Sequence, residues 1–390
     1  MSRPGRHSRP HAPSARRGFT ITELLVVIAI VILLVAIAVP ALTALVASSR
    51  RSLAENQLRA GLTAGRDAAI QSGGADGAAV FHYDLSGQVR IVPCVMVGRL
   101  PADEPMLEGD PAVGLNSIDR DVFVPVANVE AIQLPRGWGV RAYVPPSSID
   151  PDTSESAGWY EGLTGRADVG NWVFPETGFI NPAPGATPTA DPAFGGKGGF
   201  RQTFMVRFEA GSGAFKPAGG SLAIVIDPIA VEAFRTSAPW KTARIDQAED
   251  TGQFVRRLLA RPKVAHADLL KLIGSRSIDA VLAGPVAELA LYDESRMIAA
   301  IGARGPNRAT RTIYGNNDPS PAKRDETPVA PTIDTYLFTE GTLSADEINR
   351  RVAQWIEGRY TPDGATGPVA SDARIFTLQT YLGQVQELEP

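Results

Sequence analysis

A single carboxylate stands at the start of the longest apolar run of the chain. Glu23 directly precedes residues 24–47, which carry no charge, and residues 1–18 hold five arginines and no acid. An ionisable group beside such a run is costly, so it implies a partner of opposite charge. The chemistry that this arrangement favours is charge pairing at the boundary of a membrane.

The apolar run is long enough to cross a bilayer. As a helix, residues 24–47 would extend about 36 Å at ~1.5 Å per residue, and a hydrocarbon core of about 30 Å needs ~20 residues. The arginines ahead of the run place the N-terminal head in the cytoplasm by the positive-inside rule. Pro40, inside the run, removes a helix hydrogen bond and loosens the helix. We therefore expect a single-pass inner-membrane protein whose body lies in the periplasm of a two-membrane bacterium.

One acidic loop has the spacing of a calcium site. Oxygen-bearing residues fall at loop positions 1, 3, 5 and 12, namely Asp150, Asp152, Ser154 and Glu161. Glu155 takes the place of the glycine that the sharp turn of such a loop needs. We therefore expect a solvated acidic loop, with no calcium binding tighter than about millimolar.

The rest of the chain offers little other chemistry. Cys94 is the only cysteine, and the two histidines outside the basic head, His82 and His266, are far apart, which excludes a Cys/His metal site. Beyond residue 18 the chain has 33 basic side chains (38 minus 5) and 42 acidic ones, a net charge of −9. This charge does not suit phosphate-backbone binding. We expect no catalytic residues, no cofactor and no nucleic-acid partner.

The sequence around the start of the apolar run resembles the processing site of the type IV pilin and pseudopilin family. The resemblance lies in residues 17–29, RGFTITELLVVIA. It implies that a prepilin peptidase cuts after Gly18 and methylates the new N-terminal residue, Phe19. Glu23 is then the fifth residue of the mature chain and Pro40 the twenty-second, where the family has Glu and a helix-loosening Pro.

The resemblance also implies a role for the two charges near the cut. Cleavage would leave a cationic amine on Phe19, which Glu23 of a neighbouring subunit can neutralise in surroundings of low dielectric constant. The implied partners are other pilin or pseudopilin subunits, the prepilin peptidase and the inner membrane. The resemblance implies that the processed chain is a structural subunit of a type II secretion pseudopilus or of a type IV pilus-like fibre.

Three other interpretations of the N-terminus stay open. A conventional signal peptide would use residues 24–35 as its apolar region and Ala36-Ile37-Ala38 as its cleavage site. A twin-arginine export signal is suggested by Arg16-Arg17. A plain membrane anchor would leave Gly18 and Glu23 without a role.

The segments after the run predict an α+β, pilin-like fold. Residues 48–72 continue the helix into water, so that one helix of about 50 residues packs its second half on an antiparallel sheet; a separate short helix is the alternative. Gly61 and Gly65 weaken this helix, and Gly73-Gly74 end it. Strands are expected at 78–84 and 88–97 as one hairpin, at 200–210 and 221–227 as another, and between them at 122–127, 129–134 and 138–144.

Two short motifs in these segments are similar to the H-type minor pseudopilins of type II secretion. One is the helix end Leu62–Ile70 (LTAGRDAAI), and the other is the strand end Arg207-Phe208 followed by Gly211. The resemblance implies a minor subunit, and it leaves secretion, adhesion, motility and DNA uptake open.

The predicted organisation has five parts. They are a leader 1–18, a membrane half 19–47 and an amphipathic half 48–72 of the helix, a β-rich body 73–230 with an inserted loop 146–199, and a large C-terminal extension 231–390. In the extension we expect helices at 246–261, 266–274 and 344–359, a strand at 287–293 and a polar linker at 303–333. A membrane-tethered module that binds a secreted protein or a glycan through this extension is the alternative function.

Overall fold

The computed structural model describes the chain in ten segments. They are residues 21–83, 88–100, 119–144, 171–173, 202–216, 223–226, 251–260, 280–302, 345–379 and 385–388. The chain forms two units, Met1–Ser52 and Leu53–Pro390. Among the predicted features, the leader, the calcium loop, the helix at 266–274 and the linker at 303–333 lie outside the described residues.

The N-terminal helix is a single element. Helix α1 runs from Ile21 to Gln71, so the prediction of one long helix is confirmed and the alternative of a separate short helix is wrong. It ends where Gly73 and Gly74 adopt positive φ angles of 70° and 124°, which side chains other than glycine rarely tolerate.

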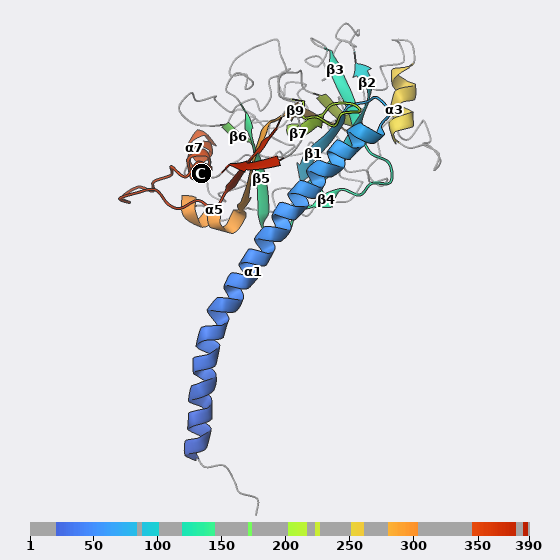
Figure 1. The fold of residues 1–390 in the computed structure, drawn as a ribbon. Helices are drawn as coiled ribbons and strands as arrows, with labels where there is room; N and C mark the ends of the chain where they lie inside the picture. The colour runs from blue at the N-terminus through green and yellow to red at the C-terminus, as the bar shows by residue number, and fades with distance from the viewer. Residues whose placement is uncertain are drawn as a thin grey trace, which may run out of the picture. The chain divides into compact units, whose positions relative to one another are not determined.

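Six described strands, several of which are labelled beside the end of α1 in Figure 1, close into a β-barrel. They are β1 (Gly77–Tyr83), β2 (Val89–Leu100), β3 (Arg120–Pro125), β7 (Gln202–Phe208), β8 (Ala223–Ile226) and β9 (Ala280–Pro285). The hydrogen-bonded order is β1-β7-β9-β8-β3-β2, and β1 also pairs with β2 over its whole length, which closes the ring. The short strand β4 (Ile132–Gln133) pairs with β2 outside the ring. Closure leaves none of the six strands as an open sheet edge.

The predicted α+β class is confirmed, but one of the two predicted hairpins is wrong. The first hairpin, β1 with β2, is antiparallel as expected. The second one is wrong, because β9 lies between β7 and β8 and hydrogen-bonds to both. This insertion makes β7–β9 parallel, and β3–β8 is parallel too, so the sheet is mixed rather than purely antiparallel.

A second sheet is wholly antiparallel, in the order β12-β11-β10-β5-β6. Its strands are β5 (Trp138–Val144), β6 (Asn171–Val173), β10 (Glu288–Asp293), β11 (Arg374–Leu378) and β12 (Val385–Leu388). Only two residues separate β9 from β10, so the chain passes from the barrel directly into the second sheet. Both sheets therefore contain strands from the predicted C-terminal extension.

Three short helices complete the described structure. They are α3 (Thr251–Leu259), α5 (Glu294–Ile301) and α7 (Ala345–Ile356). Asp293 caps α5 by accepting hydrogen bonds from the backbone N–H groups of Ser295 and Arg296. α3 and α7 lie within predicted helices, whereas α5 was not expected.

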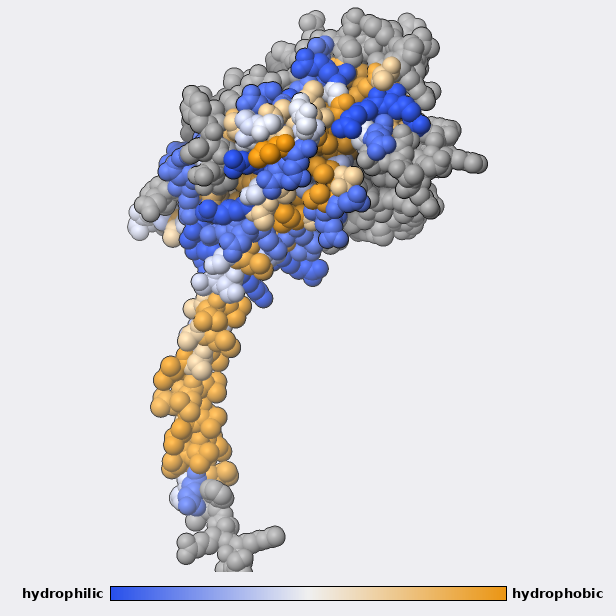
Figure 2. Space-filling view, turned by 45° about the vertical axis from the view of Figure 1, so that its right-hand side comes forward, coloured by the Kyte–Doolittle hydropathy of each residue, from blue (hydrophilic) through white to orange (hydrophobic). Residues whose placement is uncertain are grey.

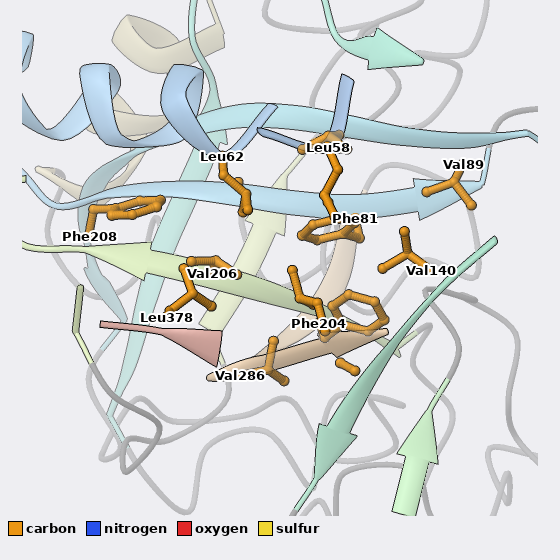
Figure 3. Close-up of a cluster of buried hydrophobic side chains, with 14 of the residues drawn as sticks. Leu58, Leu62, Phe81, Val89, Val140, Phe204, Val206, Phe208, Val286 and Leu378 are labelled. Atoms are coloured by element: carbon orange, nitrogen blue, oxygen red, sulfur yellow. The ribbon is translucent and has the colours of Figure 1, made fainter. Parts of the chain in front are cut away.

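The side chains form three buried clusters. The outer face of the barrel packs against α1, α3 and the inner face of the second sheet, and Figure 3 shows Leu58 and Leu62 of α1 reaching Phe81 and Val206 in this core. The other face of the second sheet packs against α5 and α7 around Trp355. The barrel interior is filled by its own strands, mostly with alanine and valine, as its narrow bore requires.

Candidate processing and assembly segment

Glu23 lies in the first turn of α1 and its side chain is exposed. A carboxylate there interacts favourably with the positive end of the helix dipole. The residues expected to be cut and methylated, Gly18 and Phe19, lie outside the described residues. The structure thus places the acid of the predicted charge pair at the helix start.

The first half of α1 is apolar on every side. Its most apolar 18-residue window has a mean hydropathy of 3.3, and none of that window is buried within the structure. Figure 2 shows this half as a continuous apolar surface. By length and composition it is the one described helix able to cross a membrane. Such a surface is not stable in water, which supports single-pass membrane anchoring.

Pro40 sits inside α1 without ending it. Proline has no backbone N–H, so the helix lacks one hydrogen bond at this position. The Thr43 hydroxyl donates a hydrogen bond of 2.8 Å to the Pro40 carbonyl oxygen, three residues earlier on the helix. The helix continues through this position, and the loosening expected at Pro40 stays a prediction.

The second half of α1 touches the barrel backbone to backbone. A Cβ atom built on Gly65 would lie 2.6 Å from the Ala79 nitrogen, and one built on Gly77 would lie 2.4 Å from the Ala69 nitrogen. A Cβ on Gly61 would meet the Ile91 side chain at 2.6 Å. The two helix glycines that were expected only to weaken α1 are therefore the positions at which it approaches β1 and β2.

Asp76 joins several charges beside the end of α1. Its Oδ2 accepts hydrogen bonds from Arg207 Nη2 (2.6 Å) and from Lys216 Nζ (2.9 Å), and its Oδ1 accepts one from the Ala210 N–H (3.0 Å). Arg207 Nη2 also lies 2.6 Å from Asp121 Oδ2. Arg207 and both aspartates are buried, and the guanidinium stands 5.3 Å from the centre of the Phe123 ring.

These contacts change the acidity of Asp76. Burial by itself raises the pKa of the Asp76 carboxyl, but the hydrogen bonds from Lys216, Arg207 and the Ala210 N–H outweigh it, so the pKa lies below its usual value. Asp76 therefore stays ionised at neutral pH and binds two cations at one end of the barrel. We call Asp76, Asp121, Arg207 and Lys216 the charge cluster.

The two motifs that resembled H-type pseudopilins meet beside this cluster. The Gly211 N–H donates a 3.1 Å hydrogen bond to the carbonyl oxygen of Ala69, in the last turn of α1. A Cβ on Gly213 would lie 2.9 Å from side-chain atoms of Arg66 and Ile70. The helix end and the strand end, more than 130 residues apart, thus form one joint.

The other candidate residues, those of the acidic loop and Cys94, form no metal-binding or reactive site within the described residues. The four residues of the acidic loop, Asp150, Asp152, Ser154 and Glu161, lie outside the described residues. Among the residues that the structure describes, no group of three or more His, Cys, Asp or Glu side chains could hold a metal ion. Cys94 is buried inside the barrel, and this burial raises the pKa of its thiol, which makes it a poor nucleophile.

Comparison with known proteins finds a match at the N-terminus. Residues 13–39 match the family model of the prokaryotic N-terminal methylation motif. No curated protein and no solved structure matches the chain. The matched range contains Gly18, Phe19 and Glu23, and it supports a type IV pilin-like chain that a prepilin peptidase processes.

Proposed function

We propose that this protein is a structural subunit of a type II secretion pseudopilus or a type IV pilus-like fibre. A prepilin peptidase cuts after Gly18 and methylates Phe19. The first half of α1 then holds the subunit in the inner membrane, with residues 53–390 in the periplasm, until it joins other subunits. Its role is mechanical, and we propose no catalytic residue.

The observation that carries this proposal is the match at residues 13–39, which extends into α1, a helix whose apolar half is exposed on all sides. A plain anchor requires only the apolar half. The acid in the first turn and the proline within the span are additional features, and an assembling subunit uses both: Glu23 neutralises a neighbour's amine, and Pro40 lets the helix adapt to its neighbours.

Within this class we propose an H-type minor subunit. The two short motifs behind that assignment support it, because they contact each other in the joint between α1 and the barrel. The alternative, a tethered module that binds a secreted protein or a glycan, places recognition in residues 231–390. Strands from this range are built into both sheets, which favours a structural use of the range.

Processing is the step that tests the proposal. The chain is co-expressed with a prepilin peptidase and its intact mass is measured. The expected product lacks residues 1–18 and carries one methyl group on Phe19. Gly18→Asp, which puts a side chain at the cut, should keep the whole leader.

Two results would contradict the proposal. A mature N-terminus at Val39 would identify a conventional signal peptide, and an intact Met1 in the wild type would identify a plain anchor. Copurification of the processed chain with a major pseudopilin after crosslinking, absent for Gly18→Asp, separates a fibre subunit from a tethered binding module.

A further inference from the structure

Two adjacent arginines follow the apolar half of α1. Residues 24–49 carry no charge, and Arg50 and Arg51 are the first charged residues after Glu23. Arg50 is exposed and Arg51 is half-buried. Basic residues are the less common choice at the non-cytoplasmic end of a membrane span. The five arginines of the leader already set the orientation of the span. Arg50 and Arg51 therefore have a role other than orientation.

The spacing of the charges matches a whole bilayer. Glu23 and Arg50 are 27 positions apart on one continuous helix, which is about 40 Å at ~1.5 Å per residue. A bilayer measures about 30 Å across its hydrocarbon and about 40–45 Å with its headgroup regions. When Arg50 lies at the phosphates of one leaflet, Glu23 lies near those of the other.

Hydrophobicity alone does not determine this depth. The uncharged run is several ångströms longer than the hydrocarbon, so the span can shift or tilt at a small cost. A charge contact at Arg50 removes this freedom. A guanidinium group is suited to the task, because its planar set of donors matches the oxygens of a phosphate.

We propose that Arg50 and Arg51 bind the phosphates of anionic phospholipids in the leaflet next to the body and so fix the depth of α1. Neighbouring residues on a helix point about 100° apart, so the two side chains reach two different headgroups. Phosphatidylglycerol, which has a net negative charge, is favoured over zwitterionic phosphatidylcholine. The inference rests on the membrane span of the proposed function and requires neither processing nor assembly.

The test measures which lipids stay bound to the full-length chain. The protein is placed in nanodiscs of equimolar phosphatidylglycerol and phosphatidylcholine and examined by native mass spectrometry. All variants carry glutamine in place of the five leader arginines, so that the leader binds no lipid: Arg3, Arg6, Arg9, Arg16 and Arg17. In this background we expect phosphatidylglycerol to exceed phosphatidylcholine about fivefold or more among bound lipids.

The variants show whether Arg50 and Arg51 cause the preference for phosphatidylglycerol. Arg50→Gln with Arg51→Gln should bring the ratio of bound lipids close to one, Arg50→Gln alone should lower it in part, and lysine at both positions should preserve most of it. The matched control is Arg256→Gln with Arg257→Gln, which removes two exposed charges from α3 and should change nothing.

Either of two results would overturn the inference. One is an unchanged preference for phosphatidylglycerol after both glutamine substitutions at 50 and 51. The other is an equal loss in the α3 control, which would mean that total charge and not this pair attracts the lipid. Because no peptidase or fibre is involved, failure here is distinguishable from failure of the proposed function.

Discussion

At the scale of single residues, the molecule uses carboxylates in two different settings. Glu23 is exposed at the start of an apolar helix, where the partner that we propose comes from another subunit. Asp76 is buried within the chain and has its cations beside it. The loss of Glu23 should therefore affect assembly and spare folding, whereas the loss of Asp76 should affect folding.

Glu23→Leu should leave expression, cleavage after Gly18 and membrane residence intact while reducing incorporation into the fibre. We expect a reduction of about tenfold or more, since an unpaired charge in apolar surroundings costs several kcal/mol. The measurement is the amount of subunit crosslinked to a major pseudopilin, relative to the membrane pool. Glu23→Asp should retain incorporation, and Asp67→Asn, which removes an exposed acid from the second half of α1, should have no effect. Equal incorporation of Glu23→Leu and the wild type would contradict the proposed pair between the Phe19 amine and the Glu23 carboxylate.

Asp76→Ala should lower the free energy of unfolding by about 3 kcal/mol, because it leaves Arg207 buried with one of its two carboxylates. Asp119→Ala is the control, since Asp119 is exposed and lies 3.7 Å from an exposed arginine; its loss should cost less than about 1 kcal/mol. Denaturant unfolding of the soluble body, residues 48–390, measures both.

The effect of Asp76 should also depend on pH in a defined direction. The pKa of Asp76 is lower in the folded than in the unfolded chain, so its ionisation stabilises the fold fully above the unfolded value of about 3.9. This contribution disappears as the pH falls through the folded pKa. The stability gap between wild type and Asp76→Asn should therefore be constant near neutral pH and shrink below about pH 4. A gap that grows on acidification would contradict this assignment of charge.

At the scale of elements, the joint between α1 and the barrel depends on glycine. In an exposed helix, Gly→Ala is favourable by about 1 kcal/mol. Gly65 should behave in the opposite way, because its new Cβ would lie 2.6 Å from the backbone nitrogen of Ala79, which cannot rotate away.

Gly65→Ala should thus destabilise the soluble body by about 2 kcal/mol, in the range for overpacking. Gly367→Ala is the matched control: nothing lies within 4 Å of its built Cβ, and its stability should change by less than about 0.5 kcal/mol. Thermal unfolding of both variants compares them directly. A stabilised Gly65→Ala would show that α1 and β1 do not pack as closely as described.

The elements differ in how far the sequence predicts them. The long helix α1 and the strand β10 follow from local patterns of apolar residues, and the processing motif is a continuous string. The strand β9, with the sequence AVLAGP, lacks an alternating pattern because small residues fill the narrow barrel interior. The charge cluster depends on residues 131 positions apart, Asp76 and Arg207, so only the fold brings them together.

At the scale of the whole chain, two consecutive strands, β9 and β10, connect the two sheets of the body. β9 hydrogen-bonds to both β7 and β8 in the barrel, and β10 directly after it pairs with both β5 and β11 in the second sheet. Without residues 280–293 the barrel would have two unpaired edges and the second sheet would lose its central strand. Residues 73–230, predicted as a body, therefore lack a strand that the barrel requires.

Two changes test this dependence on β9. A chain of residues 48–230 should fail to unfold cooperatively and should be digested rapidly by protease, whereas residues 48–390 should resist. Because a truncation removes much else, the sharper variant is Ala283→Asp, which puts a charge into the barrel interior at a fully buried site and should cost at least about 3 kcal/mol. Glu288→Gln, at a half-buried position of β10, is the control and should stay within about 1 kcal/mol of the wild type. If residues 48–230 unfold cooperatively with the strand content of a closed barrel, the range after residue 230 is an addition to the body, and the case for a separate binding module becomes stronger.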